Sequence, residues 1–417
     1  MRGEIIQRAH ILFQQKRYAE AEKMLASLTQ ENPNDVLVLS MLAETKIELD
    51  KIDEAEELIN TAIGIDPESA HLFYIKTRIQ LEQNKYDAAE SSIETAIKMD
   101  PDEADYHAYW ASIKLSRKQY EAALNLANEA LAIEPDNLLG LNIRSNALIK
   151  LNRKEESYET IIGALREDPN NAFTHANYGW NLLEKGNHKK ALEHFRESLK
   201  ADPDNRYAQA GMVAALKANN IFYRGFLKYA FFLGNLTAKY QWAFIIGFYI
   251  GVRIIASIAE SNPALQPYLN PLIILLAIFA FSTWVMTPIS NLLFRLNPYG
   301  RHLLDEEEIK SSNFVGISML IFLAGIISYL ITFNELFLSI AVFGFTMMVP
   351  LSVIFAKSKS KYFFVLYAAG LAIVGITAIT LIFINGKMGN PLVTVYLLGF
   401  IAFQWVANFV RIKESNF

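Results

Sequence analysis

The chain contains no cysteine, so it has no disulfide, no thiol nucleophile and no cysteine ligand for a metal. Its seven histidines all lie outside the long apolar runs described below. Three catalytic signatures are also missing: the phosphate-binding G-x-x-x-x-G-K-[ST] loop, the H-E-x-x-H zinc helix and the G-x-S-x-G nucleophile elbow. We therefore expect no catalytic residues, no bound metal and no cofactor.

Acidic residues are scarce in the second half of the chain, and this scarcity divides the sequence in two. Residues 1–220 contain 26 Lys or Arg and 36 Asp or Glu, a net charge of −10. Residues 221–417 contain 13 and 7, a net charge of +6. This asymmetry indicates two parts with different surroundings. The acidic first half also argues against a nucleic-acid partner, because binding phosphates depends on Lys and Arg.

Proline in the first half recurs at an unvarying interval of 34 residues, and an acidic or amide residue follows each one. A period of this length is the signature of a repeat architecture with one supersecondary unit per period. A proline would end the last helix of each unit, because it cannot continue a helix. The prolines are Pro33, Pro67, Pro101, Pro135, Pro169 and Pro203.

Other positions repeat in register with the prolines. Twelve residues before each proline stands a small side chain, and mostly apolar side chains follow it at intervals of four and three. A small residue where two helices cross, with apolar residues one turn later, is typical of a packed helical hairpin. The small residues are Ala21, Ala55, Ala89, Ala123, Ser157 and Ala191.

This pattern resembles the tetratricopeptide repeat family, in six units over residues 2–205. The resemblance implies an all-α fold in which residues 1–205 form a solenoid of six helical hairpins. Residues 206–219 resemble a lone first helix that caps the stack. Lys46, Gln80 and Lys114 occupy a first-helix site where the family usually has a large apolar residue. We therefore expect the middle units to pack less tightly at that site.

In this family the first helices of successive units line a groove that holds a peptide or a helix, so the resemblance implies a protein or peptide partner here. Exposed aromatic and Arg side chains are typical of binding hot spots, and Asn can hold a peptide backbone. The alternative is that these side chains pack between repeats. The candidate groove residues are His10, Phe13, His71, Tyr74, Arg78, Tyr109, Asn142, Asn146, Asn177 and Trp180.

Some family members clamp a C-terminal carboxylate with Lys and Arg beside Asn. Here Asn146 and Asn177 match that arrangement, but Asn142 stands where a Lys would be expected. The sequence therefore argues against a clamp for a chaperone tail.

Six long apolar runs fill residues 238–410, each long enough to cross a bilayer as a helix. We therefore expect a six-helix transmembrane bundle followed by a tail at 411–417. The runs are at about 241–259, 269–288, 313–333, 336–356, 362–385 and 391–410.

Charges in the loops predict the orientation of these runs, because Lys and Arg favour the cytoplasmic side. Basic residues, including Arg301, Lys357 and Lys359, lie on one side of the predicted membrane. They stand before the first run, between runs two and three, between runs four and five, and after the last run. The loops on the other side of the predicted membrane contain one basic residue, Lys387. The N-terminus, MRGEIIQRAH, also lacks the apolar core of a signal peptide. We expect a multi-pass inner (plasma) membrane protein with both termini and the repeats in the cytoplasm, similar to a class of bacterial repeat-bearing membrane proteins.

The segment 220–237 joins the two parts. Lys217, Arg224 and Lys228 recur at intervals of seven and four, which would place them on one helical stripe. Basic and aromatic residues on a helix suit the headgroup layer of a negatively charged leaflet. We expect an interfacial anchor helix, or alternatively a helix packed on the cap or on the first span. The candidate anchor residues are Phe222, Arg224, Phe226, Lys228 and Tyr229.

Gly247 and Gly251 form a G-x-x-x-G pattern within the first apolar run. This spacing lets two helix backbones approach closely. We expect the pair to pack against a neighbouring span, with dimerisation as the alternative.

These observations favour a membrane-anchored scaffold whose repeats recruit a protein or peptide. The alternative function is a transporter or lipid-handling bundle regulated by its repeats. That alternative requires a polar cavity at mid-membrane, which residues such as Thr283, Ser318 and Thr377 would line. An enzyme with a site assembled from scattered residues is the third hypothesis, and the missing signatures argue against it.

Overall fold

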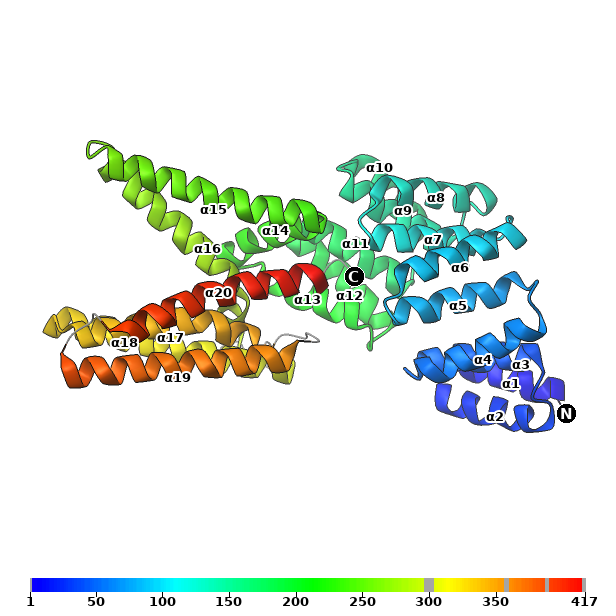
Figure 1. The fold of residues 1–417 in the computed structure, drawn as a ribbon. Helices are drawn as coiled ribbons and strands as arrows, with labels where there is room; N and C mark the ends of the chain where they lie inside the picture. The colour runs from blue at the N-terminus through cyan, green and yellow to red at the C-terminus, as the bar shows by residue number, and fades with distance from the viewer. Residues whose placement is uncertain (1, 296–303, 356–359, 387–389, 415–417) are drawn as a thin grey trace. The chain divides into compact units, whose positions relative to one another are not determined.

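The structure is a computed structural model, and it describes residues 2–295, 304–355, 360–386 and 390–414. Within these ranges it contains 20 α-helices and no strand, which confirms the predicted all-α fold (Figure 1). The chain forms two compact units, Met1–Asn177 and Tyr178–Asn416. The last predicted repeat is thus divided between them, and most of it belongs to the unit that contains the apolar helices.

The first twelve helices pair into six hairpins whose helices begin at intervals of 34 residues. The first helices are α1 (Arg2–Gln14), α3 (Val36–Glu48), α5 (Ala70–Glu82), α7 (Ala104–Ser116), α9 (Leu138–Lys150) and α11 (Ala172–Glu184). The second helices are α2 (Tyr18–Glu31), α4 (Ile52–Ile65), α6 (Tyr86–Met99), α8 (Tyr120–Ile133), α10 (Lys154–Glu167) and α12 (His188–Ala201). The small residues of the second helices are at most 1% exposed, which places them in the core as predicted.

Each hairpin turns through one residue in the left-handed conformation, with φ between 58° and 85°. L-residues pay for this conformation in steric strain, and glycine does not. Only the sixth hairpin uses glycine, Gly186. The other five use Lys16, Asp50, Asn84, Lys118 and Asn152.

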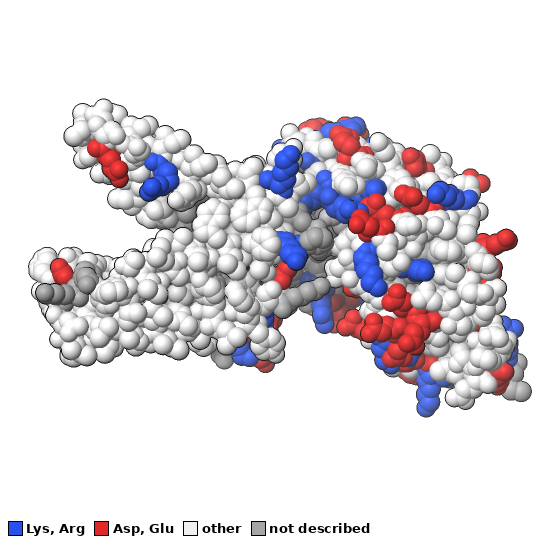
Figure 2. Space-filling model, viewed as in Figure 1, with Lys and Arg blue, Asp and Glu red and all other residues white. Residues whose placement is uncertain are grey.

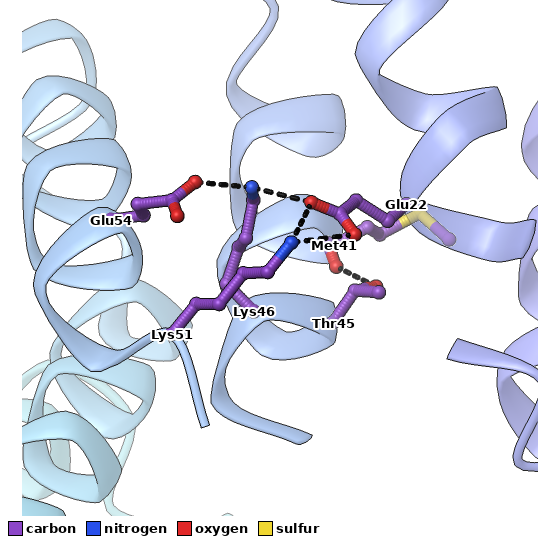
Figure 3. Close-up of polar contacts among 6 residues, drawn as sticks. All are labelled: Glu22, Met41, Thr45, Lys46, Lys51 and Glu54. Atoms are coloured by element: carbon purple, nitrogen blue, oxygen red, sulfur yellow. Dashed lines mark hydrogen bonds and ion pairs between the residues drawn. The ribbon is translucent and has the colours of Figure 1, made fainter. Parts of the chain in front are cut away.

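Lys46 lies between two acidic side chains of neighbouring helices (Figure 3). Its Nζ is 2.6 Å from Oε1 of Glu22 in α2 and also pairs with Glu54 in α4. Lys51 reaches the same Glu22 oxygen at 2.7 Å. The side chain of Lys46 is only 12% exposed, so its charge is held by paired carboxylates across the junction between the first two repeats.

The other two polar residues at this site are held in a comparable way. Nζ of Lys114 is 2.7 Å from Oε2 of Glu90, and Gln80 accepts a 2.8 Å hydrogen bond from Ser92. The Lys114 side chain is 16% exposed and Gln80 is 8% exposed. Each of these residues therefore has a polar partner on an adjacent helix in place of the family's apolar contact.

In the second unit, Phe195 joins three helices. Its ring is buried, and a Cβ built on Gly179 of α11 would lie 2.6 Å from it. A Cβ on Gly211 of α13 (Arg206–Lys217) would lie 2.2 Å from it. The ring therefore fits only because both neighbouring helices present glycine. This contact attaches α13, which begins 34 residues after α11, in the place of a seventh first helix.

Among the described residues of the second unit, six helices are long and apolar enough to cross a membrane. Figure 2 shows a mostly uncharged surface over them, whereas charged side chains cover the hairpins. Each predicted apolar run forms one of these helices, but the loop residues Arg301, Lys357, Lys359 and Lys387 lie outside the described residues. The helices are α15 (Ala238–Ser261), α16 (Gln266–Phe294), α17 (Glu306–Thr332), α18 (Glu335–Val353), α19 (Lys361–Asn385) and α20 (Pro391–Glu414).

The closest approach between these helices is made by glycines other than the predicted pair. A Cβ on Gly325 of α17 would lie 2.7 Å from the backbone nitrogen of Ala341, and one on Gly344 of α18 would lie 2.6 Å from that of Phe322. A Cβ on Gly247 or Gly251 would meet nothing within 4 Å. The structure therefore does not place the G-x-x-x-G pair against a neighbouring span of this chain, which corrects that expectation; dimerisation stays a prediction.

Candidate partner-binding site

An aromatic cluster lies on the first helices of the third and fourth repeats. The ring of Tyr74 on α5 stacks on His71 at 6.0 Å and on Tyr106 of α7 at 5.3 Å, and meets Tyr109 edge-on at 5.2 Å. Burial raises the pKa of Tyr74 and of Tyr109, so both phenols stay protonated at neutral pH. His71 is exposed and Tyr106 is buried, so the cluster presents a partly exposed aromatic face.

Arg78 lies one turn after Tyr74 and is bound by the preceding repeat. Its guanidinium nitrogens are 3.1 Å from Glu44 and 2.9 Å from Glu48, and its side chain is 19% exposed. Glu44 precedes Arg78 by 34 residues, so the pair joins equivalent positions of successive repeats. Arg78 is thus a neutralised donor beside the aromatic cluster, and a partner's acidic group would have to compete with these carboxylates.

The two candidates in the first repeat have local contacts. His10 is exposed and its Nε2 is 3.0 Å from the amide nitrogen of Gln14, while Phe13 meets Tyr18 edge-on at 5.2 Å. They belong to the hairpin of α1 and α2 and do not contribute to the aromatic cluster.

The candidate asparagines form an internal network. Asn142 donates hydrogen bonds to Thr174 and to the Leu138 carbonyl, both at 2.8 Å, and accepts one of 2.9 Å from Asn177. Asn142 is fully buried and Asn177 is 2% exposed. Asn146 is half-buried and donates a weak 3.4 Å bond to Asn177. Asn142 and Asn177 therefore hold α9 against α11 and do not face a partner, because each satisfies the buried amide of the other.

Trp180 attaches the end of the repeats to the helices that follow. Its indole nitrogen donates a 3.1 Å hydrogen bond to the carbonyl of Tyr207 on α13. Its ring also lies 5.7 Å from Phe195 and meets Phe231 of α14 (Ile221–Asn235) edge-on at 6.2 Å. The structure thus places this candidate in a packing contact with α13 and α14, within the second unit.

The predicted basic stripe is divided between two helices. Asn220 caps the start of α14, so Lys217 belongs to α13 and not to the helix of Arg224 and Lys228. Arg224 donates a 2.9 Å hydrogen bond to the Ala218 carbonyl, at the C-terminal end of α13. The stripe was wrong for Lys217 because the helix breaks between the two.

Of the remaining candidate anchor residues, some pack against other side chains and others are exposed. Tyr229 packs edge-on against Phe279 of α16 at 5.2 Å, and Phe226 lies 5.8 Å from Tyr223. Lys228 and Phe222 are exposed, the latter at 74%. One face of α14 therefore packs on the apolar helices, as the packing interpretation expects, while the other face is exposed; the interfacial anchor stays a prediction.

The alternative function would place polar side chains around a cavity. In the structure these side chains donate hydrogen bonds to backbone carbonyls. Ser318 of α17 donates a 2.8 Å hydrogen bond to Gly344 of α18. Thr283 and Thr377 donate to carbonyls of their own helices, at 2.7 Å and 2.8 Å. These hydroxyls are satisfied by backbone carbonyls, and this observation does not favour a transport pathway.

The comparisons with known proteins concern the hairpins. Family models described as tetratricopeptide repeat match residues 12–79, 78–137 and 172–205. These matches show a tetratricopeptide repeat segment within residues 12–205. No curated protein matches the chain.

Several solved structures have similar hairpins. A tetratricopeptide repeat protein from Parabacteroides merdae is 15% identical with a TM-score of 0.45, over 51% of this chain and 83% of its own. YrrB, described as a TPR protein with an unusual peptide-binding site, is 18% identical with a TM-score of 0.32, over 45% and 96%. MamA from Desulfovibrio magneticus is 18% identical with a TM-score of 0.34, over 41% and 97%.

Two contributors to the site were missed by the sequence reasoning. Tyr106 and Glu44 complete the aromatic cluster and its ion pair. The 34-residue offset between Glu44 and Arg78 was a usable signal, because equivalent positions of successive repeats are neighbours.

Proposed function

We propose that this chain is a membrane-anchored scaffold whose repeats recruit a protein or peptide partner. Repeat arrays of this kind act as protein-interaction modules. The six apolar helices embed in the inner (plasma) membrane and hold the repeats in the cytoplasm. The observation that carries the proposal is the partly exposed aromatic cluster beside Arg78, in the same chain as six helices long enough to span a bilayer.

The packing of the aromatic cluster supports it as the contact surface for a partner. Aromatic and Arg side chains dominate the binding energy of protein interfaces. Tyr buries a large area at a low entropic cost. His71, Tyr74 and Tyr109 are held in place by stacking on one another and on Tyr106, so little order would be lost on binding. The candidates at Asn142, Asn177 and Trp180 are occupied by internal contacts, which concentrates the proposal on the third and fourth repeats.

Site-specific photocrosslinking in intact cells tests this proposal. A photoreactive side chain replaces His71, which is exposed, and a matched one replaces Tyr158, which is 51% exposed on the second helix α10. We expect a discrete protein adduct from position 71 in the membrane fraction, and its loss in the Arg78→Gln background. The same adducts at both positions, or none at position 71, would contradict the proposal.

A further inference from the structure

A cavity of about 500 Å³ lies within the second unit, between α13–α14 and the C-terminal half of α16. Its wall is mostly apolar and includes Phe222, Ile289, Leu293 and Phe294. The volume is within the usual range for a small-molecule site. The mouth includes Phe222, whose side chain is largely exposed.

One cation lines this apolar cavity. The side chain of Lys217 is 3% exposed, and its Nζ is 3.8 Å from Oε1 of Glu308 and 5.8 Å from the centroid of the Phe294 ring. An ammonium has three hydrogens to donate, and 3.8 Å is longer than an ordinary hydrogen bond. The described residues thus give Lys217 one long ion pair. Burial lowers the pKa of Lys217, and Glu308 opposes this shift.

Apart from Lys217, the polar residues that line the cavity are uncharged. They are Asn219, Asn220, Tyr223 and Ser290. An occupant with an apolar chain and a compact anionic group would match this distribution. The apolar chain would lie along Ile289 and Leu293, and the anion would accept hydrogen bonds from the Lys217 donors that no described residue takes.

We propose that this cavity binds an anionic phospholipid from the surrounding bilayer, with its phosphate at Lys217 and an acyl chain along α16. The proposal rests on the membrane placement proposed above, in which the end of α16 near Phe294 lies at the inner leaflet. Anionic lipids attract basic groups at this surface. The lipid would fill the space between α13–α14 and the C-terminal half of α16.

Native mass spectrometry of the full chain in detergent, with added phosphatidylglycerol, phosphatidylcholine or oleate, tests this inference. We expect phosphatidylglycerol to bind at least tenfold more tightly than phosphatidylcholine. Lys217→Met should abolish this preference, and Lys217→Arg should retain it. Lys310→Gln is the matched control, because Lys310 is exposed and pairs with Glu306 one turn away, so its loss should change nothing.

A second variant separates lipid binding from folding. Lys217→Met combined with Glu308→Gln removes both charges of the pair, so no buried charge is left alone, and it should also lose the preference. An undiminished preference in either variant, or equal binding of phosphatidylcholine, would overturn the inference. Tighter binding of oleate than of phosphatidylglycerol would overturn it as well. If carbonate washing released the chain from membranes, the membrane placement itself would fail, which is a separate result.

Discussion

The third and fourth repeats differ from the fifth and sixth in how they use the same helix face. In the former, His71, Tyr74 and Tyr109 remain partly exposed beside Arg78. In the latter, Asn142 and Asn177 are buried against each other. The inner face of a repeat is therefore available to a partner only where its side chains are not needed to join the next helix.

Among the first-helix side chains that join the next helices, Trp180 should contribute most to the free energy of unfolding. Trp180→Ala removes the hydrogen bond to Tyr207 and the contacts with Phe195 and Phe231, so we expect a loss of about 3 kcal/mol. Faster hydrogen exchange of the α13 amides in the full chain would report it. Phe173→Ala is the matched control, since Phe173 is 46% exposed on the same helix and should cost less than about 1 kcal/mol. Equal exchange in both variants would show that Trp180 does not hold α13.

Breaking the hydrogen bonds between the asparagines should have the next largest effect on stability. Asn177→Ala leaves the buried amide oxygen of Asn142 without its donor, and an unsatisfied buried acceptor costs about 1–3 kcal/mol. The thermal unfolding midpoint of the full chain in detergent measures it. Asn146→Ala removes only the weak 3.4 Å bond, so a comparable drop there would argue against the network.

The ion pair at the third and fourth repeats offers an internal comparison with the next junction. Glu90 and Lys114 are equivalent to Leu124 and Leu148, which are 3% and 0% exposed in one apolar cluster. Glu90 also pairs with Arg117, which keeps a second carboxylate in Asp87. Glu90→Leu alone therefore leaves Lys114 without its carboxylate and should cost about 1–3 kcal/mol.

The double variant Glu90→Leu with Lys114→Leu recreates the apolar junction. Replacing a buried pair by packed apolar side chains is often neutral or stabilising, so we expect a change of less than about 1 kcal/mol. Denaturation midpoints compare the single and double variants. A double variant as unstable as the single one would mean that the ion pair is required for packing.

Substitutions in the hairpin turns should change stability least. Asp50 has φ of 61° and is exposed, so Asp50→Gly should stabilise the chain by about 0.5 kcal/mol. Gly186 has φ of 85°, so Gly186→Ala should destabilise it by about 1 kcal/mol. Unfolding midpoints that move in the same direction for both variants would contradict the steric argument.

The repeat period predicted the helices well because it is a property of spacing. Proline positions and the buried small residues placed all six hairpins, and unbroken apolar runs placed the six long helices. Neighbours were harder to predict, because spacing shows which residues share a face but not what covers that face. Gly247 and Gly251 have the spacing of a close contact and meet nothing within 4 Å, whereas Gly325 and Gly344 make the contact without any such pattern.

The candidate site was predictable only in part for the same reason. The resemblance placed Tyr74, Arg78 and Tyr109 correctly on first helices, and they do lie together. It could not show that Trp180 is covered by α13 and α14, because those helices lie beyond the repeats in sequence.

The central claim is that apolar helices hold the repeats on the inner side of a membrane, and the absence of cysteine makes a direct test possible. Ser116→Cys in α7 and Ser261→Cys at the end of α15 are matched, since both serines are exposed and bond to the carbonyl four residues earlier. The measurement is labelling of intact cells with a membrane-impermeant maleimide. We predict that position 261 reacts at once and position 116 only after permeabilisation. Labelling of position 116 in intact cells would contradict the account.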